Sequence, residues 1–135
     1  MEARILIVED EALIALHLEQ IVSDAGHHAV GIAFDPAEAA VLAAKHRPDF
    51  AFVDMRLRHG GSGLDVARHL LDVYGMSSIL VSGNLDDRSA EAAASLMPVA
   101  MIGKPFMPST ILGAIDLAVR RLDGSTRRRS GLFGA

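Results

Sequence analysis

The sequence predicts an α/β fold in which five β-strands and five α-helices alternate, a (βα)5 arrangement around a parallel sheet. Five short runs of apolar and β-branched residues alternate with longer amphipathic segments, which is the pattern of successive βαβ units. Half of the 135 residues are hydrophobic and none is cysteine. One domain of this size can form a core without metal or disulfide support.

The first half of the chain contains three predicted strands and two predicted helices. The strands are residues 5–8, 29–33 and 50–53. An apolar stripe at helical spacing indicates a first helix that ends at Gly26, and it consists of Ile14, Leu18, Ile21, Val22 and Ala25. A second stripe indicates a helix that ends at Arg47–Pro48, and it consists of Ala37, Ala40, Val41 and Ala44.

The second half contains strands at residues 78–81 and 99–102 and three helices. The stripe of the third helix ends at Gly75 and consists of Val66, Ala67, Leu70, Leu71 and Tyr74. The stripe of the fifth helix ends at Gly124 and consists of Leu112, Ile115, Val119 and Leu122. The fourth helix is expected within residues 85–96, where most apolar residues are alanines that bury little area. We therefore expect its anchorage to be the weakest.

Composition and charge restrict the class of protein. The net charge is −4, and residues 1–124 carry −7 when Arg127, Arg128 and Arg129 are left out, so the body is a poor surface for nucleic acid. The N-terminus resembles no signal peptide, and no apolar run approaches membrane-spanning length. We expect a cytoplasmic protein with a folded domain at residues 1–123 and a disordered basic tail at residues 124–135.

Polar side chains stand at the ends of four predicted strands. Glu9 and Asp10 follow the first strand, Asp54 the third and Ser82 the fourth, while Lys104 lies just beyond the fifth. Ligands of an open parallel sheet bind beyond the carboxyl ends of its strands, where these groups would converge. If the first and third strands are adjacent, a divalent cation would offset the repulsion among three carboxylates. Oxygen ligands suit Mg²⁺ together with a phosphoryl group, and Asp54 is then the best-placed nucleophile.

Four short segments, in this order, resemble the receiver domain of two-component response regulators. They are Ile5-Leu6-Ile7-Val8-Glu9-Asp10-Glu11, Phe52-Val53-Asp54, Leu80-Val81-Ser82-Gly83 and Lys104-Pro105-Phe106. The resemblance covers residues 3 to about 123 and implies a doubly wound five-stranded parallel sheet of the flavodoxin-like order 2-1-3-4-5. It also implies a phosphorylation-dependent signalling switch. We expect a stand-alone receiver, with a fragment of a longer regulator as the alternative.

The resemblance implies a phosphoacceptor and its metal ligands. Asp54 matches the aspartate that accepts a phosphoryl group from a sensor histidine kinase or a histidine phosphotransfer protein. Asp10 and Asp54 match direct ligands of Mg²⁺ or Mn²⁺, the backbone carbonyl of Arg56 a further ligand, and Glu9 an acid that reaches the metal through water. Such a chain is a phosphoacceptor and not an enzyme, beyond phosphorylation by small donors and loss of its own phosphoryl group.

Further residues match the phosphoryl-binding and switch positions of the family. Ser82 and Lys104 match the hydroxyl and the ammonium group that contact the phosphoryl group, and the Lys104–Pro105 peptide bond is expected to be cis. Met101 stands where receivers often carry the aromatic residue that moves with the hydroxyl on activation.

Two positions match residues that commonly influence the lifetime of the acyl phosphate. Arg56 and Asn84 each follow a site residue by two positions, Asp54 and Ser82 respectively. The sequence does not determine whether they lengthen or shorten that lifetime.

Output is expected to pass through a partner protein. The expected fourth helix, fifth strand and fifth helix together form the face that would bind a downstream protein target, with no direct contact to nucleic acid or membrane. A phosphorylation-dependent dimer is an open alternative. The arginines at positions 127, 128 and 129 are expected to be solvated.

Simpler roles and other functions remain open at this point. Asp10 and Asp54 could cap the helices that follow them, Ser82 could belong to a turn, and Lys104 could be a surface lysine. A phosphatase of the haloacid-dehalogenase kind also uses a strand-end aspartate and Mg²⁺, but it requires an acid where this chain has Arg56. A third alternative is an unphosphorylated receiver-like scaffold that acts by binding alone. Such a scaffold would not need the complete set of Asp10, Asp54, Ser82 and Lys104.

Overall fold

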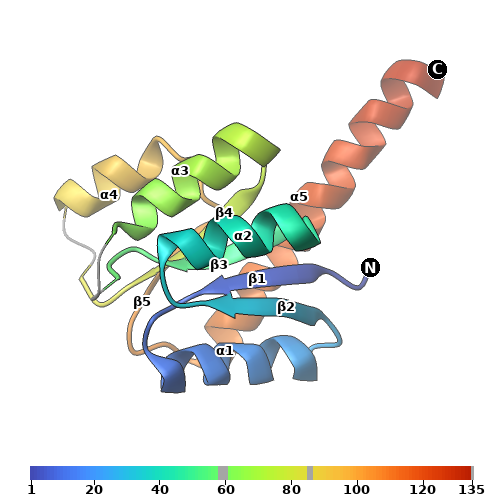
Figure 1. Cartoon of the computed structure of the whole chain (residues 1–135). Coiled ribbons are helices and arrows are strands. Elements are labelled where there is room, and N and C mark those ends of the chain that lie inside the picture. Colours follow the sequence, from blue (N-terminus) through green and yellow to red (C-terminus); the bar gives the residue numbers. More distant parts are fainter. Residues whose placement is uncertain (58–60, 85–86, 135) are drawn as a thin grey trace.

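Five parallel strands form one sheet in the order β2-β1-β3-β4-β5. They are β1 (Arg4–Val8), β2 (His28–Ala33), β3 (Phe50–Asp54), β4 (Ser77–Ser82) and β5 (Ala100–Gly103). The helices are α1 (Ala12–Asp24), α2 (Pro36–His46), α3 (Gly63–Tyr74), α4 (Asp87–Ala94) and α5 (Pro108–Gly134) (Figure 1). The computed structural model describes residues 1–57, 61–84 and 87–134, with the backbone alone for residues 87–89 and 125–134. The predicted α/β fold and strand order are confirmed.

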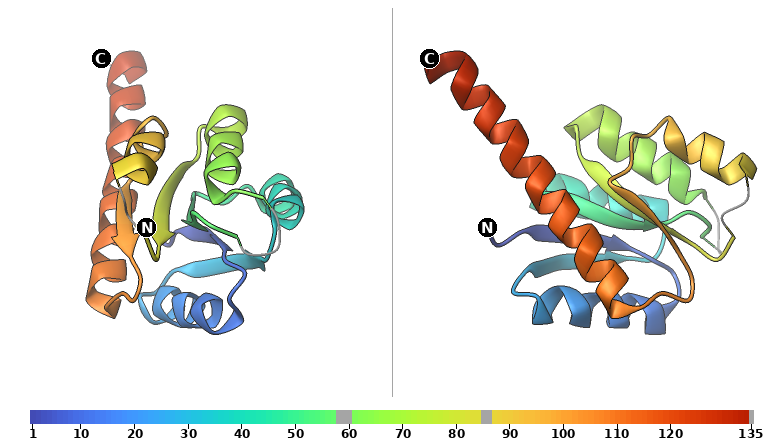
Figure 2. Two further views of the ribbon diagram at one scale, coloured as in Figure 1. Left: turned by 90° about the vertical axis from the view of Figure 1, so that its left-hand side faces the viewer. Right: turned by 180° about the vertical axis from the view of Figure 1, so that it is seen from behind.

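The sheet is covered by helices on both faces (Figure 2). Successive side chains of a strand point to opposite faces, so β1 directs Ile5 and Ile7 toward α1 and α5 and Leu6 and Val8 toward α2, α3 and α4. Strands β1 and β3 lie inside the sheet, and each has apolar residues in both cores. A strand covered on both faces reads as a continuous apolar run, which is why the sequence identifies both.

Local sequence explains where α2 and α3 begin and end. The Asp35 side chain accepts a 2.8 Å hydrogen bond from the N–H of Glu38, and Pro36 occupies the first helical turn. Ser62 caps α3 in the same way, because its Oγ accepts from the N–H of Leu64 at 3.1 Å. Helix α3 ends at Gly75, whose φ of 63° suits a residue without a side chain.

The apolar stripe predicted for α2 lies largely on the exposed side of the helix. Ala39 and Ala43 are the buried residues of α2, whereas Val41 from the predicted stripe is 64% exposed. Alanine occupies five positions of this helix, so apolar residues occur around most of its circumference. The prediction of the buried face was wrong because periodicity cannot distinguish faces when small apolar residues occur on all of them.

Two helices differ in extent from the prediction. Helix α5 continues to Gly134, whereas the sequence predicts its end at Gly124; the disorder of residues 124–135 stays a prediction. Gly124 does not have a positive φ, and a glycine inside a helix costs only about 1 kcal/mol relative to alanine. The last turns of α5 extend past the sheet (Figures 1 and 2). Helix α4 ends at Ala94, and residues 85 and 86 of its expected start lie outside the described residues.

Among residues 1–57, 61–84 and 87–134, no helix combines the length and the apolar character that a membrane span needs.

Candidate functional site

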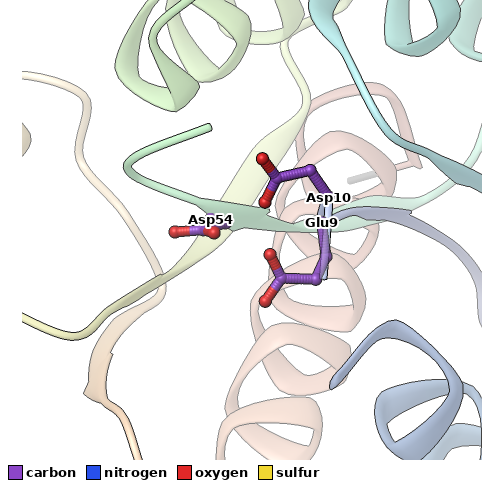
Figure 3. Close-up of side chains that lie close together, drawn as sticks. All are labelled: Glu9, Asp10 and Asp54. Atoms are coloured by element: carbon purple, nitrogen blue, oxygen red, sulfur yellow. The ribbon is translucent and has the colours of Figure 1, made fainter. Parts of the chain in front are cut away.

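Three acidic side chains meet at the carboxyl ends of β1 and β3. Because β1 pairs with β3 in parallel, Glu9 and Asp10, which follow β1, come next to Asp54 at the end of β3. Carboxylate oxygens of the three residues lie within 4.8 Å of one another. Glu9 and Asp10 leave the chain on opposite sides, and Asp54 lies beside them (Figure 3). The sheet therefore brings together the three acids that the sequence singles out.

Lys104 is the cation of this cluster. Its Nζ lies 2.6 Å from Oε1 of Glu9 and 3.1 Å from Oδ2 of Asp54. The backbone N–H of Lys104 donates to the carbonyl of Ser82 at 2.8 Å, which ties the end of β5 to the end of β4. The side chain of Lys104 is only 14% exposed, so the simpler interpretation as a solvated surface lysine does not hold.

Two of the three acids are almost completely shielded from solvent, while Asp10 is half-buried. Glu9 is 1% exposed and Asp54 5% exposed. Oε2 of Glu9 is buried without a hydrogen-bond partner among the described residues. Buried anionic oxygens are unfavourable unless they are paired with a charge or coordinate a metal. An unpartnered carboxylate oxygen beside two further carboxylates fits a divalent cation that prefers oxygen ligands, such as Mg²⁺.

Burial and charge shift two pKa values in the cluster. The pKa of Glu9 is raised to about 7, chiefly by burial and also by the neighbouring Asp54 carboxylate, while Lys104 opposes the change. Burial alone would lower the pKa of Lys104, but its contacts with Glu9 and Asp54 outweigh this effect and raise it. Burial and the Asp54 carboxylate therefore favour the protonated form of Glu9, while the two acids favour the charged form of Lys104.

The two carboxylate oxygens of Asp54 have different partners. Oδ2 faces Lys104, whereas Oδ1 accepts a hydrogen bond of 3.1 Å from the backbone N–H of Arg56. Arg56 lies on the surface. Its backbone forms a hydrogen bond to Asp54, while the metal-binding role of its carbonyl stays a prediction.

Ser82 takes part in a local turn. Its Oγ donates to the carbonyl of Asn84 at 3.0 Å and accepts from the N–H of Asn84 at 3.1 Å. Ser82 is 1% exposed, whereas Asn84 is exposed. The turn that the sequence leaves open as an alternative is thus present. Contact with a phosphoryl group would require the hydroxyl of Ser82 to leave Asn84.

The segment after β5 lies between the site and α1. The Lys104–Pro105 peptide bond is cis. The Phe106 ring stacks on the His17 ring of α1, with 5.5 Å between ring centres. Met101, at the position of the usual switch aromatic, is 38% exposed on β5.

Glu11 is a further acid of the cluster, and its role was not predicted from the sequence. Its Oε1 lies 4.0 Å from Nζ of Lys104. The sequence does contain a feature that could have indicated Glu11, since it is the third of three consecutive acids after β1. It was missed because strand alternation assigns side-chain directions within β1 but not at Glu11, the third residue after the strand and the residue directly before α1.

Comparison with known proteins gives consistent results. A family model of the response regulator receiver domain matches residues 5–116. The phyllosphere-induced regulator PhyR of Methylorubrum extorquens is 32% identical over 96% of the chain and 48% of its own length. The transcriptional regulatory protein PdtaR of Mycobacterium tuberculosis is 33% identical over 87% of the chain and 57% of its own length.

A solved structure shares the fold as well. The anti-anti-sigma factor PhyR from Bartonella quintana superposes with a TM-score of 0.79 at 26% identity, covering 96% of this chain and 52% of that protein. The chain thus spans about half the length of these relatives.

Proposed function

The chain belongs to the response regulator receiver domain family, and we propose that it is a signalling switch in which Asp54 accepts a phosphoryl group in the presence of Mg²⁺. Receiver domains are signalling phosphoacceptors. One observation carries the assignment of Asp54: its buried carboxylate lies between the ammonium group of Lys104 and two further acids at the carboxyl edge of the sheet. The domain is proposed to comprise residues 1–123.

The proposed reaction transfers a phosphoryl group to a carboxylate oxygen of Asp54. An oxygen–phosphorus bond forms, the bond from phosphorus to a histidine nitrogen of the donor breaks, and that nitrogen recovers a proton. The ammonium group of Lys104 exchanges its contact with Oδ2 of Asp54 for one with a phosphoryl oxygen. Mg²⁺, when bound, supplies the charge that neutralises carboxylates and phosphoryl oxygens. Glu9, Asp10 and Asp54 are the side chains that would hold it, together with the Arg56 carbonyl.

The switch is proposed to begin at Ser82. A phosphoryl group adds nearly two negative charges and new acceptor oxygens, which compete with the Asn84 carbonyl for the Ser82 hydroxyl. Because Ser82 and Asn84 bond to each other, a rotation of the hydroxyl alters the backbone at Asn84. The population is then proposed to shift between two arrangements of Ser82, Asn84 and α4. Arg56 and Asn84, both on the surface, are proposed to influence the attack of water on the acyl phosphate.

The output surface is proposed to be α4, β5 and α5. Helix α4 is tied to α3 through the Arg68 guanidinium, which donates to Oγ of Ser95 just beyond α4 at 3.0 Å. Met97, which follows α4, is 68% exposed, and Met101 on β5 is 38% exposed. Exposed methionines adapt to varied partner surfaces. A partner that binds this face would therefore sense a change in α4, and phosphorylation-dependent pairing of two copies would use the same face.

The phosphodonor is proposed to approach beside α1. Leu13 is 84% exposed three residues after Asp10, and Met107 is 67% exposed three residues after Lys104. The stacked His17 and Phe106 rings join the two segments that carry them. An apolar rim beside a buried acid suits a protein donor, such as a sensor histidine kinase or a histidine phosphotransfer protein.

The downstream target is proposed to be a protein and not nucleic acid. The acidic balance of residues 1–124 supports this proposal, as does the name of a relative, the anti-anti-sigma factor PhyR. Since the chain covers only about half of that relative, the activity of the whole relative is not assigned to this chain. We expect the chain to act in the cytoplasm.

The test is phosphorylation by acetyl phosphate with Mg²⁺, followed by measurement of the intact mass. Wild type should gain one phosphoryl group, Asp54→Ala none, and the surface control Asp72→Ala one group. No gain in wild type would favour a receiver-like scaffold. Multiple turnover of the donor with no stable gain would favour a phosphatase.

A further inference from the structure

Gly63, the first residue of α3, lies directly against the backbone of Asp54. A Cβ atom at this position would lie 1.7 Å from the carbonyl oxygen of Asp54, 2.6 Å from its carbonyl carbon and 2.9 Å from Cα of Met55. Real Cβ contacts essentially never fall below 3.0 Å. All three atoms belong to the backbone, so no flexible side chain can move aside. Any other residue here must displace the strand end that carries Asp54.

A pair of hydrogen bonds links Gly63 to the Asp54 carboxylate. The N–H of Gly63 donates to the carbonyl of Met55 at 3.1 Å. On the other side of the same peptide group, the N–H of Arg56 donates to Oδ1 of Asp54 at 3.1 Å. The orientation of the Met55–Arg56 peptide group therefore depends on Gly63 at one end and determines a contact of Asp54 at the other.

The backbone on either side supports this connection. Arg56 and Ser62 form an isolated antiparallel bridge, and the Ser62 side chain caps the first turn of α3. Gly61 also stands at a close approach, since a Cβ there would lie 2.4 Å from Cγ of Pro36. That neighbour is a side chain at the start of α2, not the backbone of the phosphoacceptor. The constraint on Asp54 thus falls on Gly63.

We propose that Gly63 is a positioning residue for phosphorylation. The missing side chain lets the first turn of α3 lie against Asp54, and its N–H orients the peptide group that fixes Oδ1. It also holds the backbone at Arg56, whose carbonyl is proposed to bind the metal. This inference rests on the proposed function of Asp54. It assigns a role to a residue that contacts neither metal nor phosphoryl group.

The first experiment compares Gly63→Ala with Gly113→Ala. Gly113 also lies in a helix, but a Cβ there meets nothing within 4 Å. To reach 3.0 Å, the new Cβ at position 63 must move relative to the Asp54 oxygen by about 1.3 Å, and displacements of about 1 Å can slow a reaction roughly 100-fold. We expect Gly63→Ala to lower the phosphorylation rate by acetyl phosphate roughly 100-fold at saturating Mg²⁺. Gly113→Ala should match wild type.

A merely structural role would give a different result. Circular dichroism and urea unfolding would then show a destabilised Gly63→Ala protein, while its folded fraction would be phosphorylated at the wild-type rate. Rates are therefore compared at a temperature and pH where both variants are folded. A wild-type rate in folded Gly63→Ala would overturn the proposal.

A second pair of variants decides the matter even if Gly63→Ala does not fold. Ser62→Ala and Asp35→Ala each remove an N-cap side chain, from α3 and α2 respectively, so their losses of stability should be similar. Only Ser62 supports the turn against Asp54. We expect Ser62→Ala to lower the phosphorylation rate severalfold, because the first turn of α3 then holds Gly63 less firmly against Asp54, and Asp35→Ala to leave the rate unchanged. Equal rates in these two variants would contradict the proposal.

The outcomes also separate this inference from the proposed function. If wild type gains no phosphoryl group on Asp54, the proposed function fails. If wild type is phosphorylated and folded Gly63→Ala or Ser62→Ala reacts equally fast, the function stands and the positioning role fails.

Discussion

The ammonium group of Lys104 lies closer to Glu9 than to Asp54, at 2.6 Å from Oε1 of Glu9 and 3.1 Å from Oδ2 of Asp54. Glu9 thus holds the lysine in place beside the proposed phosphoacceptor. A metal ion bound to the acids would compete with this lysine for the same negative charge. The protonation of Glu9, the binding of a metal ion and the contacts of Lys104 therefore depend on one another. Each of the three can be tested separately.

Replacement of Lys104 should separate metal binding from phosphorylation. In Lys104→Met, the acids lose a competing positive charge, so we expect Mg²⁺ to bind more tightly, by roughly tenfold at the effective dielectric of such sites. Phosphorylation should nevertheless slow by roughly 100-fold, because no ammonium group stabilises the phosphoryl oxygens. Calorimetry gives the affinity and intact mass the rate. The control is Lys45→Met, at an exposed position of α2. Weaker Mg²⁺ binding in Lys104→Met than in wild type would contradict the prediction.

Stability without metal should decrease as the pH rises from about 4.5 to 7. The pKa of Glu9 is raised from 4.5 to about 7 in the folded protein, so the folded state binds more protons than the unfolded state in this window, and ionisation favours unfolding. The loss should amount to roughly 2 to 3 kcal/mol. Urea unfolding across this range measures it.

The control for the pH prediction is Glu9→Gln, which cannot ionise. Its stability should change less between pH 4.5 and 7 than that of wild type, and the difference isolates Glu9 from other carboxylates. Mg²⁺ affinity of wild type should rise over the same window, because the metal binds the ionised acid. Parallel pH profiles for wild type and Glu9→Gln would show that Glu9 does not titrate there.

Mg²⁺ should stabilise the folded protein through the acidic cluster. A ligand that binds only the folded state at 100 times its dissociation constant adds about 2.7 kcal/mol. We expect this gain in wild type, its reversal by a chelator, and its loss in Asp10→Ala. Asp116→Ala, an exposed position on α5, should retain the gain. Thermal unfolding with and without Mg²⁺ provides the measurement, and an equal gain in Asp10→Ala would place the metal elsewhere.

His27 should contribute to stability without any effect on phosphorylation. Its Nδ1 accepts a 2.9 Å hydrogen bond from the N–H of Ala3, a residue with no exposed surface. His27→Ala leaves that buried donor without its partner, at a cost of about 1 to 2 kcal/mol. Urea unfolding should detect the loss, while His28→Ala, with an exposed side chain, should show little. A phosphorylation rate below wild type in folded His27→Ala would contradict a purely structural role.

The sequence predicted the sheet more fully than the helices. Strands β1 and β3 are apolar on both faces, so they read as continuous runs and their ends place Glu9, Asp10 and Asp54. The buried face of α2 was predicted wrongly, because alanines around the helix leave no clear period. The extent of α5 was underestimated, because Gly124 permits both a helix end and a helix interior, and only the backbone conformation distinguishes them.

The sequence by itself determined the fold class, through the alternation of strands and helices. The strand order followed from the family resemblance. The polar residues at the strand ends identified the acids and the lysine of the candidate site. The tertiary structure decided which of their atoms meet. Lys104 contacts Glu9, Asp54 and Glu11 across long stretches of sequence, and Gly63 lies against Asp54 with no space for a side chain. Sequence patterns report periodicity and chemistry, whereas contact distances and the space available to a side chain depend on how distant segments pack together.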